Sequence, residues 1–413
     1  MLSAILPVRS LLLAIFMLMA GSGFMATLIS VRLEAADRSA LTVGVVGTAY
    51  FLGLVAGSLK SGALVVRVGH IRAFAAFVSL FSASTLTYAI DSHPALWTCL
   101  RFIDGLCIAG VYICLESWLN ERADTQARGS VLAGYMMALY IGQALGQFLL
   151  NLSDAKPSMP FLVASILISL SAIPVALTRI TAPPLAGGTT LRVRELYASS
   201  PLAIVGAIIT GLMLGAFYAL GGVYARRLGM DLSSVALFMS AVILGGVALQ
   251  WPLGRLSDRF DRRRVIVASF AGTLAASLGI WLVDAPGPLL LVLGMVFGGL
   301  SFGLYPLCVA HANDRLVPEQ RVAATGSLVL MYSAGAAAGP LAGALAMTLA
   351  GASGLFLYVA ACAGGTLLFG LWRQARALPV PLHQQHDYRV LPRTTPVSAA
   401  LDPLAPDEPE KLK

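Results

Sequence analysis

Residues 254–263 read Gly254-Arg-Leu-Ser-Asp258-Arg259-Phe-Asp261-Arg262-Arg263, a charged stretch between two long apolar runs at 232–253 and 265–283. An α-helix needs about 20 apolar residues to cross the hydrocarbon of a bilayer, and each flanking run is close to that length. The pattern therefore predicts a helical hairpin whose basic turn lies at one membrane surface.

The same alternation of apolar run and short polar turn continues over most of the 413 residues. The chain is 58% hydrophobic and only 12% charged, whereas an average soluble domain carries about 25% charge. This composition excludes disorder, nucleic-acid binding and an ordinary cytosolic enzyme. Hydrocarbon forces each backbone polar group to bond within its own segment, so runs of this length should be helices. The fold class expected is an all-α integral membrane protein with twelve transmembrane helices, at 10–31, 41–65, 73–90, 95–118, 130–151, 160–178, 201–223, 232–253, 265–283, 288–311, 322–350 and 354–372.

Basic residues in the short loops set the orientation of these helices. With the N-terminus inside, the inner loops hold fourteen arginines and the outer loops hold five basic residues. Cytoplasmic loops carry the excess of Lys and Arg, so both termini should be cytoplasmic. The net charge of +8 fits loops beside anionic lipid, with the bilayer as partner and no nucleic acid.

The sequence also contains an internal repeat. A shift of 193 residues places Asn120-Glu121-Arg122 on Asn313-Asp314-Arg315, and a shift of 192 places Gly62 and Arg67 on Gly254 and Arg259. A nearly constant offset over several helices predicts two parallel six-helix halves, the architecture of alternating-access transporters. The expected domains are an N-terminal bundle at 1–178, a cytoplasmic linker at 179–200, a C-terminal bundle at 201–372 and a disordered cytoplasmic tail at 373–413.

The loop at 254–263 resembles the signature Gly-x-x-x-Asp-Arg-x-Gly-Arg-Arg of the major facilitator superfamily, with Asp261 in place of the second glycine. The equivalent loop, Gly62-Ala-Leu-Val-Val66-Arg67-Val-Gly69-His70, keeps its glycines and has Val66 in place of the aspartate. Arg101-Phe-Ile-Asp104-Gly105 is similar to the family's helix 4 motif Arg-x-x-Gln-Gly. Arg101-Phe102, Glu116-Ser117 and Gln250-Trp251-Pro252-Leu-Gly-Arg255 resemble the YcaD-like bacterial subgroup. The resemblance implies twelve helices in two pseudo-symmetric halves and a transport function.

In the family, loops of this kind latch the two halves together on the cytoplasmic side. The resemblance implies a cytoplasmic gate built from Gly62, Arg67, Gly69, Gly254, Asp258, Arg259 and Arg262. A helix N-terminus favours a nearby carboxylate by about 0.3–1 kcal/mol, so Asp258 would dock on a helix start of the other half. The alternative is a solvated basic turn that only fixes topology.

Charged residues within the helices point to function, because a charge at mid-membrane costs about 2.5–3.5 kcal/mol on insertion scales. Arg101 and Asp104 are neighbours on one helix face, and Glu116 lies nearer the cytoplasmic end of the same helix. The resemblance implies a role for Arg101 in proton coupling, with Asp104 and Glu116 as candidate proton carriers. The alternatives are a structural pair of Arg101 with Asp104, and an anchor of Glu116 to Arg67, Arg72 or Arg128.

Polar and aromatic residues in the helices are candidates for the wall of a central cavity. Gln143 and Gln147 would either bind a substrate or tie the fifth predicted helix, 130–151, to the fourth, 95–118. In the family, helices 1, 4, 7 and 10 face the cavity, which makes Tyr112, Phe217, Tyr218 and Tyr305 candidates as well. The alternative for each aromatic residue is simple packing.

Together these features predict a secondary active transporter for a small organic solute or amphiphile, working as a monomer and driven by an ion gradient, with H⁺ the expected ion. The rivals are an uncoupled uniporter and a membrane sensor or scaffold. We expect no enzyme, cofactor or metal, because the five cysteines form no ligand pattern and Gly299-Leu-Ser301-Phe-Gly303 lies in an apolar helix. No Gly-Lys pair for a nucleotide-binding loop occurs.

Overall fold

The computed structural model describes residues 8–122, 128–178, 191–376 and 379–402. Over these ranges every regular element is a helix, and each of the predicted apolar runs lies on one helix or on two consecutive helices. The first half of the chain forms α2 (Arg9–Ser22), α3 (Met25–Ala35), α4 (Ala40–Val68), α5 (His70–Thr87), α6 (Pro94–Arg122), α7 (Arg128–Gly146), η2 (Gln147–Ser153), α8 (Met159–Leu170) and α9 (Ala172–Ala176).

The second half forms α10 (Val193–Ser199), α11 (Pro201–Arg227), α12 (Leu232–Arg259), α13 (Arg262–Val283), α14 (Pro288–Asn313), α15 (Pro318–Ala350) and α16 (Gly354–Arg376). Within the described residues, ten helical segments are long and apolar enough to cross a membrane, counting α2 with α3 and α8 with α9 as one each. The helices α5 and α7 lie outside that set. The fold is therefore the expected all-α membrane architecture.

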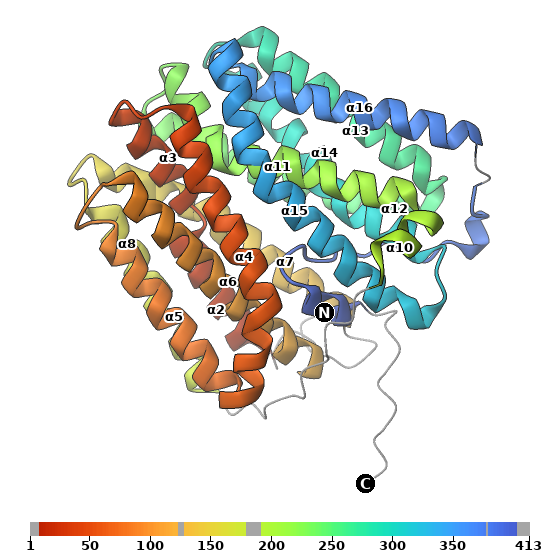
Figure 1. Cartoon of the computed structure of the whole chain (residues 1–413), viewed down its shortest axis with the longest axis horizontal. Helices are drawn as coiled ribbons and strands as arrows, with labels where there is room; N and C mark the ends of the chain where they lie inside the picture. The colour runs from red at the N-terminus through yellow and green to blue at the C-terminus, as the bar shows by residue number, and fades with distance from the viewer. Residues whose placement is uncertain (1–7, 123–127, 179–190, 377–378, 403–413) are drawn as a thin grey trace.

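The same helix pairs pack together in the two halves, which lie side by side in Figure 1. The pairing of α4 with α6 matches that of α12 with α14, and the pairing of α2 with α7 matches that of α11 with α15. Glycines permit these contacts at equivalent places. A Cβ on Gly53 would lie 2.0 Å from the carbonyl oxygen of Phe102, and one on Gly245 would lie 2.1 Å from that of Met295. Small residues let the helix backbones approach this closely.

The first membrane segment is broken between α2 and α3, at Gly23 and Phe24. The side-chain nitrogen of Gln147 donates to the Gly23 carbonyl at 3.1 Å, and the Thr27 hydroxyl donates to the Gln147 side-chain oxygen at 3.0 Å. A free carbonyl in an apolar interior is costly, so Gln147 stabilises the break. Gln147 thus ties the fifth predicted helix to the first, whereas the structural role considered for it was a tie to the fourth.

The two halves are in direct contact at the end where α3 and α11 finish, which we call the distal end. There Arg227 Nε lies 2.7 Å from Glu34 Oε1 across the halves. Nearer the middle, the Thr48 hydroxyl donates to the Ala337 carbonyl at 2.9 Å. A Cβ on Gly47 would lie 2.6 Å from the Ala219 Cβ, so α4 and α11 also touch. The distal end is closed by the helices themselves.

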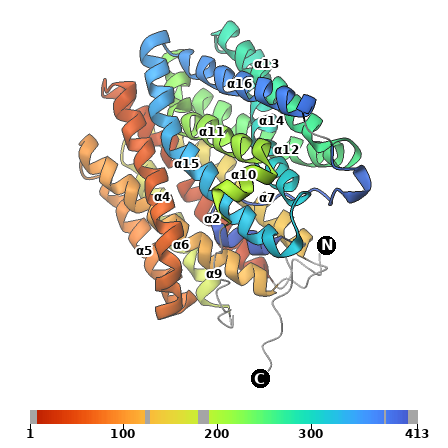
Figure 2. The same ribbon diagram turned by 45° about the vertical axis from the view of Figure 1, so that its right-hand side comes forward.

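At the opposite end, which we call the terminal end, both chain termini lie (Figure 1). Here residues 379–402, the C-terminal segment, lie between the halves as the dark-blue stretch in Figure 2. This segment contains η3 (Leu382–Gln384) and η4 (Pro396–Leu401), and η4 packs on α6 and α15. The prediction of a disordered tail is corrected over these residues, because Leu391, Ala399 and Leu401 bury their side chains. Residues 377–378 and 403–413 lie outside the described residues, as do residues 179–190 of the predicted linker.

Candidate functional site

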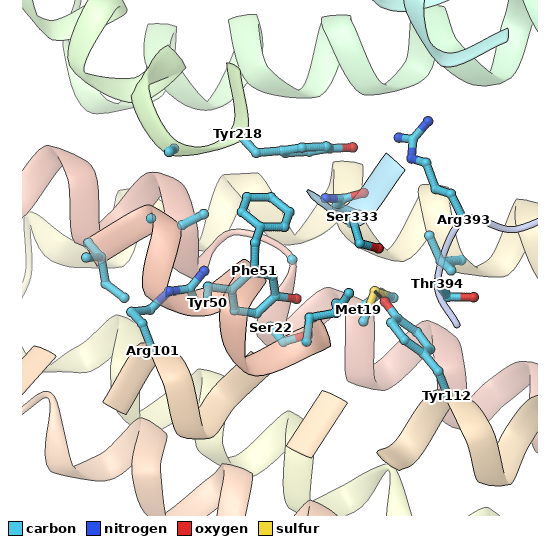
Figure 3. A pocket seen from close by; sticks show the side chains of 18 of the residues that line it. Met19, Ser22, Tyr50, Phe51, Arg101, Tyr112, Tyr218, Ser333, Arg393 and Thr394 are labelled. Atoms are coloured by element: carbon cyan, nitrogen blue, oxygen red, sulfur yellow. Dashed lines mark hydrogen bonds between the residues drawn. The ribbon is translucent and has the colours of Figure 1, made fainter. Parts of the chain in front are cut away.

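A cavity of about 160 Å³ lies between the two halves. Figure 3 shows side chains from both halves and from the C-terminal segment pointing into it. Its wall is mainly apolar, with a small number of polar and aromatic groups. These are Ser22, Ser30, Tyr50, Phe51, Phe81, Arg101, Tyr112, Tyr140, Gln143, Tyr218, Tyr332, Ser333, Arg393 and Thr394. An apolar hollow with a few convergent polar groups is the usual form of a small-molecule site.

Arg101 of α6 forms one end of this wall. Its guanidinium carbon lies 4.1 Å from the centre of the Tyr50 ring, and Nη1 lies 3.6 Å from Asp104 Oδ2. Asp104 lies behind Arg101 and does not line the cavity. Its two oxygens accept hydrogen bonds from the Ser84 hydroxyl at 2.6 Å and the Tyr88 hydroxyl at 2.7 Å. The structure thus brings Arg101 and Asp104 together, with the arginine presented to the cavity.

Glu116 lies on α6 with its side chain fully buried. Its carboxylate accepts hydrogen bonds from the hydroxyls of Thr394, Thr395 and Tyr135, at 2.6 Å from Thr395 and 3.2 Å from Tyr135. The considered anchor to Arg67, Arg72 or Arg128 is therefore corrected to an anchor for the C-terminal segment. The sequence gives no signal for this contact, because the threonines follow the carboxylate by almost 280 residues.

Of the other candidates, Gln143, Tyr112 and Tyr218 line the cavity. Tyr305 lies just outside it and packs edge-on against Tyr332, with ring centres 5.4 Å apart. Phe217 is fully buried among other aromatic rings. The cavity also has wall residues that the sequence analysis missed. These are Tyr50 and Phe51 on α4, Tyr140 on α7, Tyr332 and Ser333 on α15, and Arg393 and Thr394 of the C-terminal segment.

The loop after α12 is held by buried charge. Arg262 exposes 1% of its side chain, and its guanidinium pairs with Asp314 and donates to the carbonyls of Ala310 and His386. Asp258 lies 3.6 Å from Arg262 and accepts a hydrogen bond from the backbone N–H of Tyr388 at 2.7 Å. The expected docking of Asp258 on a helix start of the other half is thus corrected. It docks on the C-terminal segment.

Asp261 caps the start of α13 in the same loop. Its carboxylate accepts hydrogen bonds from the backbone N–H and the guanidinium of Arg263. Burial by itself raises the pKa of the Asp261 carboxyl, but the hydrogen bonds and charge of Arg263 outweigh it and lower the pKa below its usual value. The replacement of the family's glycine by aspartate at this position therefore provides a helix cap.

The loop after α4 is arranged differently. Gly69 adopts a φ of +90°, in the region that favours glycine, and joins α4 directly to α5. A Cβ on Gly62 would meet no atom within 4 Å, and the side chain of Arg67 is exposed. Arg259, the counterpart of Arg67, is exposed as well. The predicted gate residues therefore divide into a group that holds the C-terminal segment, namely Gly254, Asp258 and Arg262, and a group at the surface.

Known proteins resemble this chain over nearly its full length. A family model for the Major Facilitator Superfamily matches residues 11–251 and 202–401. The chain is 30% identical over 380 residues to an uncharacterized MFS-type transporter, YcaD, of Salmonella arizonae, covering 91% of this chain and 98% of that protein. The YcaD protein of Salmonella enteritidis PT4 matches with the same figures.

Two solved structures share the fold. The nucleoside transporter NupG matches with a TM-score of 0.74 at 14% identity, covering 90% of this chain and 98% of that one. A bacterial homolog to the human lysosomal transporter Spinster, in an inward-facing and occupied conformation, matches with a TM-score of 0.72 at 13% identity, covering 92% and 97%. At these identities the likeness concerns the fold alone.

Proposed function

The chain belongs to the major facilitator superfamily, and on that premise we propose that it carries a small organic solute or amphiphile across a bacterial inner membrane by alternating access. It is a multi-pass membrane transporter and not an enzyme. The observation that carries the proposal is the cavity between the halves, which is closed by helices at the distal end and bordered by the C-terminal segment at the terminal end.

The repeated pairing of helices supports two pseudo-symmetric halves that rock about this cavity. Equivalent glycines lie at the closest helix contacts of both halves, as with Gly142 against Phe16 and Gly335 against Ile208. The excess of arginine in the loops at the terminal end favours a cytoplasmic location for both termini. Twelve crossings follow if α5 and α7 span the bilayer together with the ten segments above. A single chain encloses the cavity, which favours a monomer as the working unit.

Proton coupling is the finer part of the proposal. Arg101 faces the cavity, and Asp104 pairs with it from behind. A proton on Asp104 would therefore weaken the ion pair with Arg101 and alter the charge that a solute meets in the cavity. Moving one charge through 100 mV releases about 2.3 kcal/mol, enough for roughly fiftyfold accumulation of a neutral solute. The second candidate is an uncoupled uniporter, favoured by the full set of hydrogen bonds to the Asp104 carboxylate.

Internal pH in proteoliposomes tests this proposal, with a panel of small solutes and lipophilic compounds added one at a time. The expected result is a compound-dependent pH change that is absent from empty liposomes and from Asp104→Asn protein. The matched control is Asp91→Asn, an exposed aspartate in the loop before α6, which should behave as wild type. Accumulation of a labelled solute against its gradient by Asp104→Asn would contradict the coupling role.

A further inference from the structure

Arg393 of the C-terminal segment lies among aromatic rings from both halves. Its guanidinium carbon is 4.7 Å from the centre of the Phe302 ring and 5.3 Å from that of Tyr332. The Tyr218 hydroxyl points toward the guanidinium (Figure 3), and the two groups interact electrostatically. A cation within about 6 Å of a ring centre is attracted by the electron-rich ring face, and more strongly where water is excluded.

Four rings lie around the guanidinium, and we call them the aromatic cage: Tyr140, Tyr218, Phe302 and Tyr332. Phe302 contacts Tyr140 and Tyr218 at ring-centre distances of 5.6 and 6.0 Å. Tyr140 comes from the first half of the chain, and the other three come from the second half. A ligand held by the cage would therefore contact both halves at once.

The charges near the cage also favour a cation. Within the described residues no carboxylate lies at ion-pair distance from Arg393, so the ring faces and the Tyr218 hydroxyl hold its charge. Glu116, a fully buried carboxylate, is bound by the next two residues of the same segment, Thr394 and Thr395. Without the C-terminal segment, the aromatic faces would lose their cation, and the buried Glu116 carboxylate would lose two of its hydrogen bonds.

We propose that the aromatic cage is a binding subsite for an organic cation, and that Arg393 fills it as an internal occupant which leaves when such a cation binds. The inference rests on the proposed function, because it takes the central cavity to be the path of the solute. It deepens that function by naming a class of substrate, a quaternary ammonium or guanidinium compound with an apolar body.

The contacts that hold the C-terminal segment are compatible with the departure of Arg393 from the aromatic cage. Outside the cage the segment is held by the packing of Leu391, Ala399 and Leu401 and by polar contacts at the terminal end. There Asp258, Arg262 and Asp314 bind the backbone of Tyr388 and His386. Such groups can exchange their partners for water at the membrane surface. The segment stays tethered to α16, so its effective concentration is high and it competes with a free cation.

Equilibrium binding of phenyltrimethylammonium to the purified full-length chain tests the proposal by isothermal titration calorimetry. Arg393→Ala empties the cage while the rest of the segment remains. We expect this variant to bind the probe at least about tenfold more tightly than wild type, a change of about 1.4 kcal/mol. The matched control is Arg389→Ala, which removes a tail arginine that pairs with Asp387 outside the cage and should leave the affinity at the wild-type value.

A second variant tests the cage itself. Phe302→Leu in the Arg393→Ala background should lose most of the gained affinity for phenyltrimethylammonium. The affinity for tert-butylbenzene, the neutral isostere of the probe, should not rise when Arg393 is removed. An unchanged affinity for the cation in Arg393→Ala would overturn the proposal, and so would an equal gain for the neutral compound.

The binding assay needs no flux or ion gradient. A solute-dependent pH change without cation binding would therefore contradict the cation subsite alone and leave the proposed transport function standing. Cation binding without any flux would contradict the proposed transport function.

Discussion

Two loop regions occupy matching places in the two halves of the molecule, residues 62–72 where α4 passes into α5 and residues 254–264 where α12 passes into α13. They are held in opposite ways. In the second loop, Arg262 is buried and bonded to Asp314, and Asp258 and Gly254 contact Tyr388 of the C-terminal segment. The charged groups of Arg262 and Asp258 in that loop each have a bonding partner. The loop both fastens its own half and supports the segment that enters the cavity.

The first loop has the same length but different chemistry at the decisive positions. His70 stands where Arg262 stands in the second loop, and its ring packs at a tilt against Trp118 with ring centres 5.7 Å apart. Val66 stands in place of Asp258 and is 71% exposed. Glu121, the counterpart of Asp314, is exposed. The comparison teaches that the repeat preserves a short junction between two helices, whereas the buried acid–arginine pair decides which half holds the C-terminal segment.

The largest effect expected from this comparison follows the removal of Arg262. Arg262→Ala leaves the Asp314 carboxylate buried without its guanidinium, and breaking a buried pair in this way costs about 3–5 kcal/mol. Arg67→Ala, in the exposed position of the first loop, should change the free energy of unfolding by less than about 0.5 kcal/mol. Equilibrium unfolding in mixed detergent micelles measures both. If the Arg262→Ala protein were as stable as the Arg67→Ala protein, the buried pair of Arg262 and Asp314 would not stabilise the fold.

A smaller effect is expected from the two glycines that begin the loops. A Cβ on Gly254 would lie 2.4 Å from Cδ1 of Tyr388, whereas a Cβ on Gly62 would meet nothing within 4 Å. Forcing extra atoms into a packed site costs about 1–3 kcal/mol. Gly254→Val should therefore release the C-terminal segment and speed tryptic cleavage after Arg389 and Arg393 about tenfold. Gly62→Val is the matched control. Equal cleavage of the two variants would contradict the docking of Tyr388 on Gly254.

The smallest effect is expected from restoring the missing acid of the first loop. Val66→Asp places a carboxylate four residues before His70, as Asp258 lies four residues before Arg262. The position is exposed, so the free energy of unfolding should change by less than about 0.5 kcal/mol in the same detergent assay. A gain in the free energy of unfolding above about 1.5 kcal/mol would mean that the acid alone stabilises the loop, without a buried arginine and its partner.

The membrane fold was predictable from sequence because the bilayer imposes one requirement on every span, a long apolar helix with its backbone bonded internally. The family was predictable because the loop at 254–263 and the motif at Arg101 keep the spacing of charged residues. The pairing of Arg101 with Asp104 was predictable as one of two interpretations, since residues three apart share a helix face.

The cavity wall and the C-terminal segment were less accessible to sequence reasoning. Tyr50, Tyr140 and Tyr332 look like ordinary packing residues, and only the assembly of the helices turns their rings toward Arg101 or Arg393. The composition after residue 373 is rich in proline and polar residues, as in a solvated tail. Its docking depends on Asp258, Asp314 and Glu116, which lie far away in sequence, and periodicity carries no information about such contacts.

The central claim is that the two ends of the molecule open in alternation. It is tested most directly by distances between spin labels in two pairs at exposed positions. Val66 and Phe260 span the halves at the terminal end, and Ile90 and Leu282 span them at the distal end. When a transported solute is added to the labelled protein in liposomes, the account predicts a shorter distance population for the terminal pair and a longer one for the distal pair. Distances that stay fixed, or that lengthen together, while the solute binds would contradict alternating access.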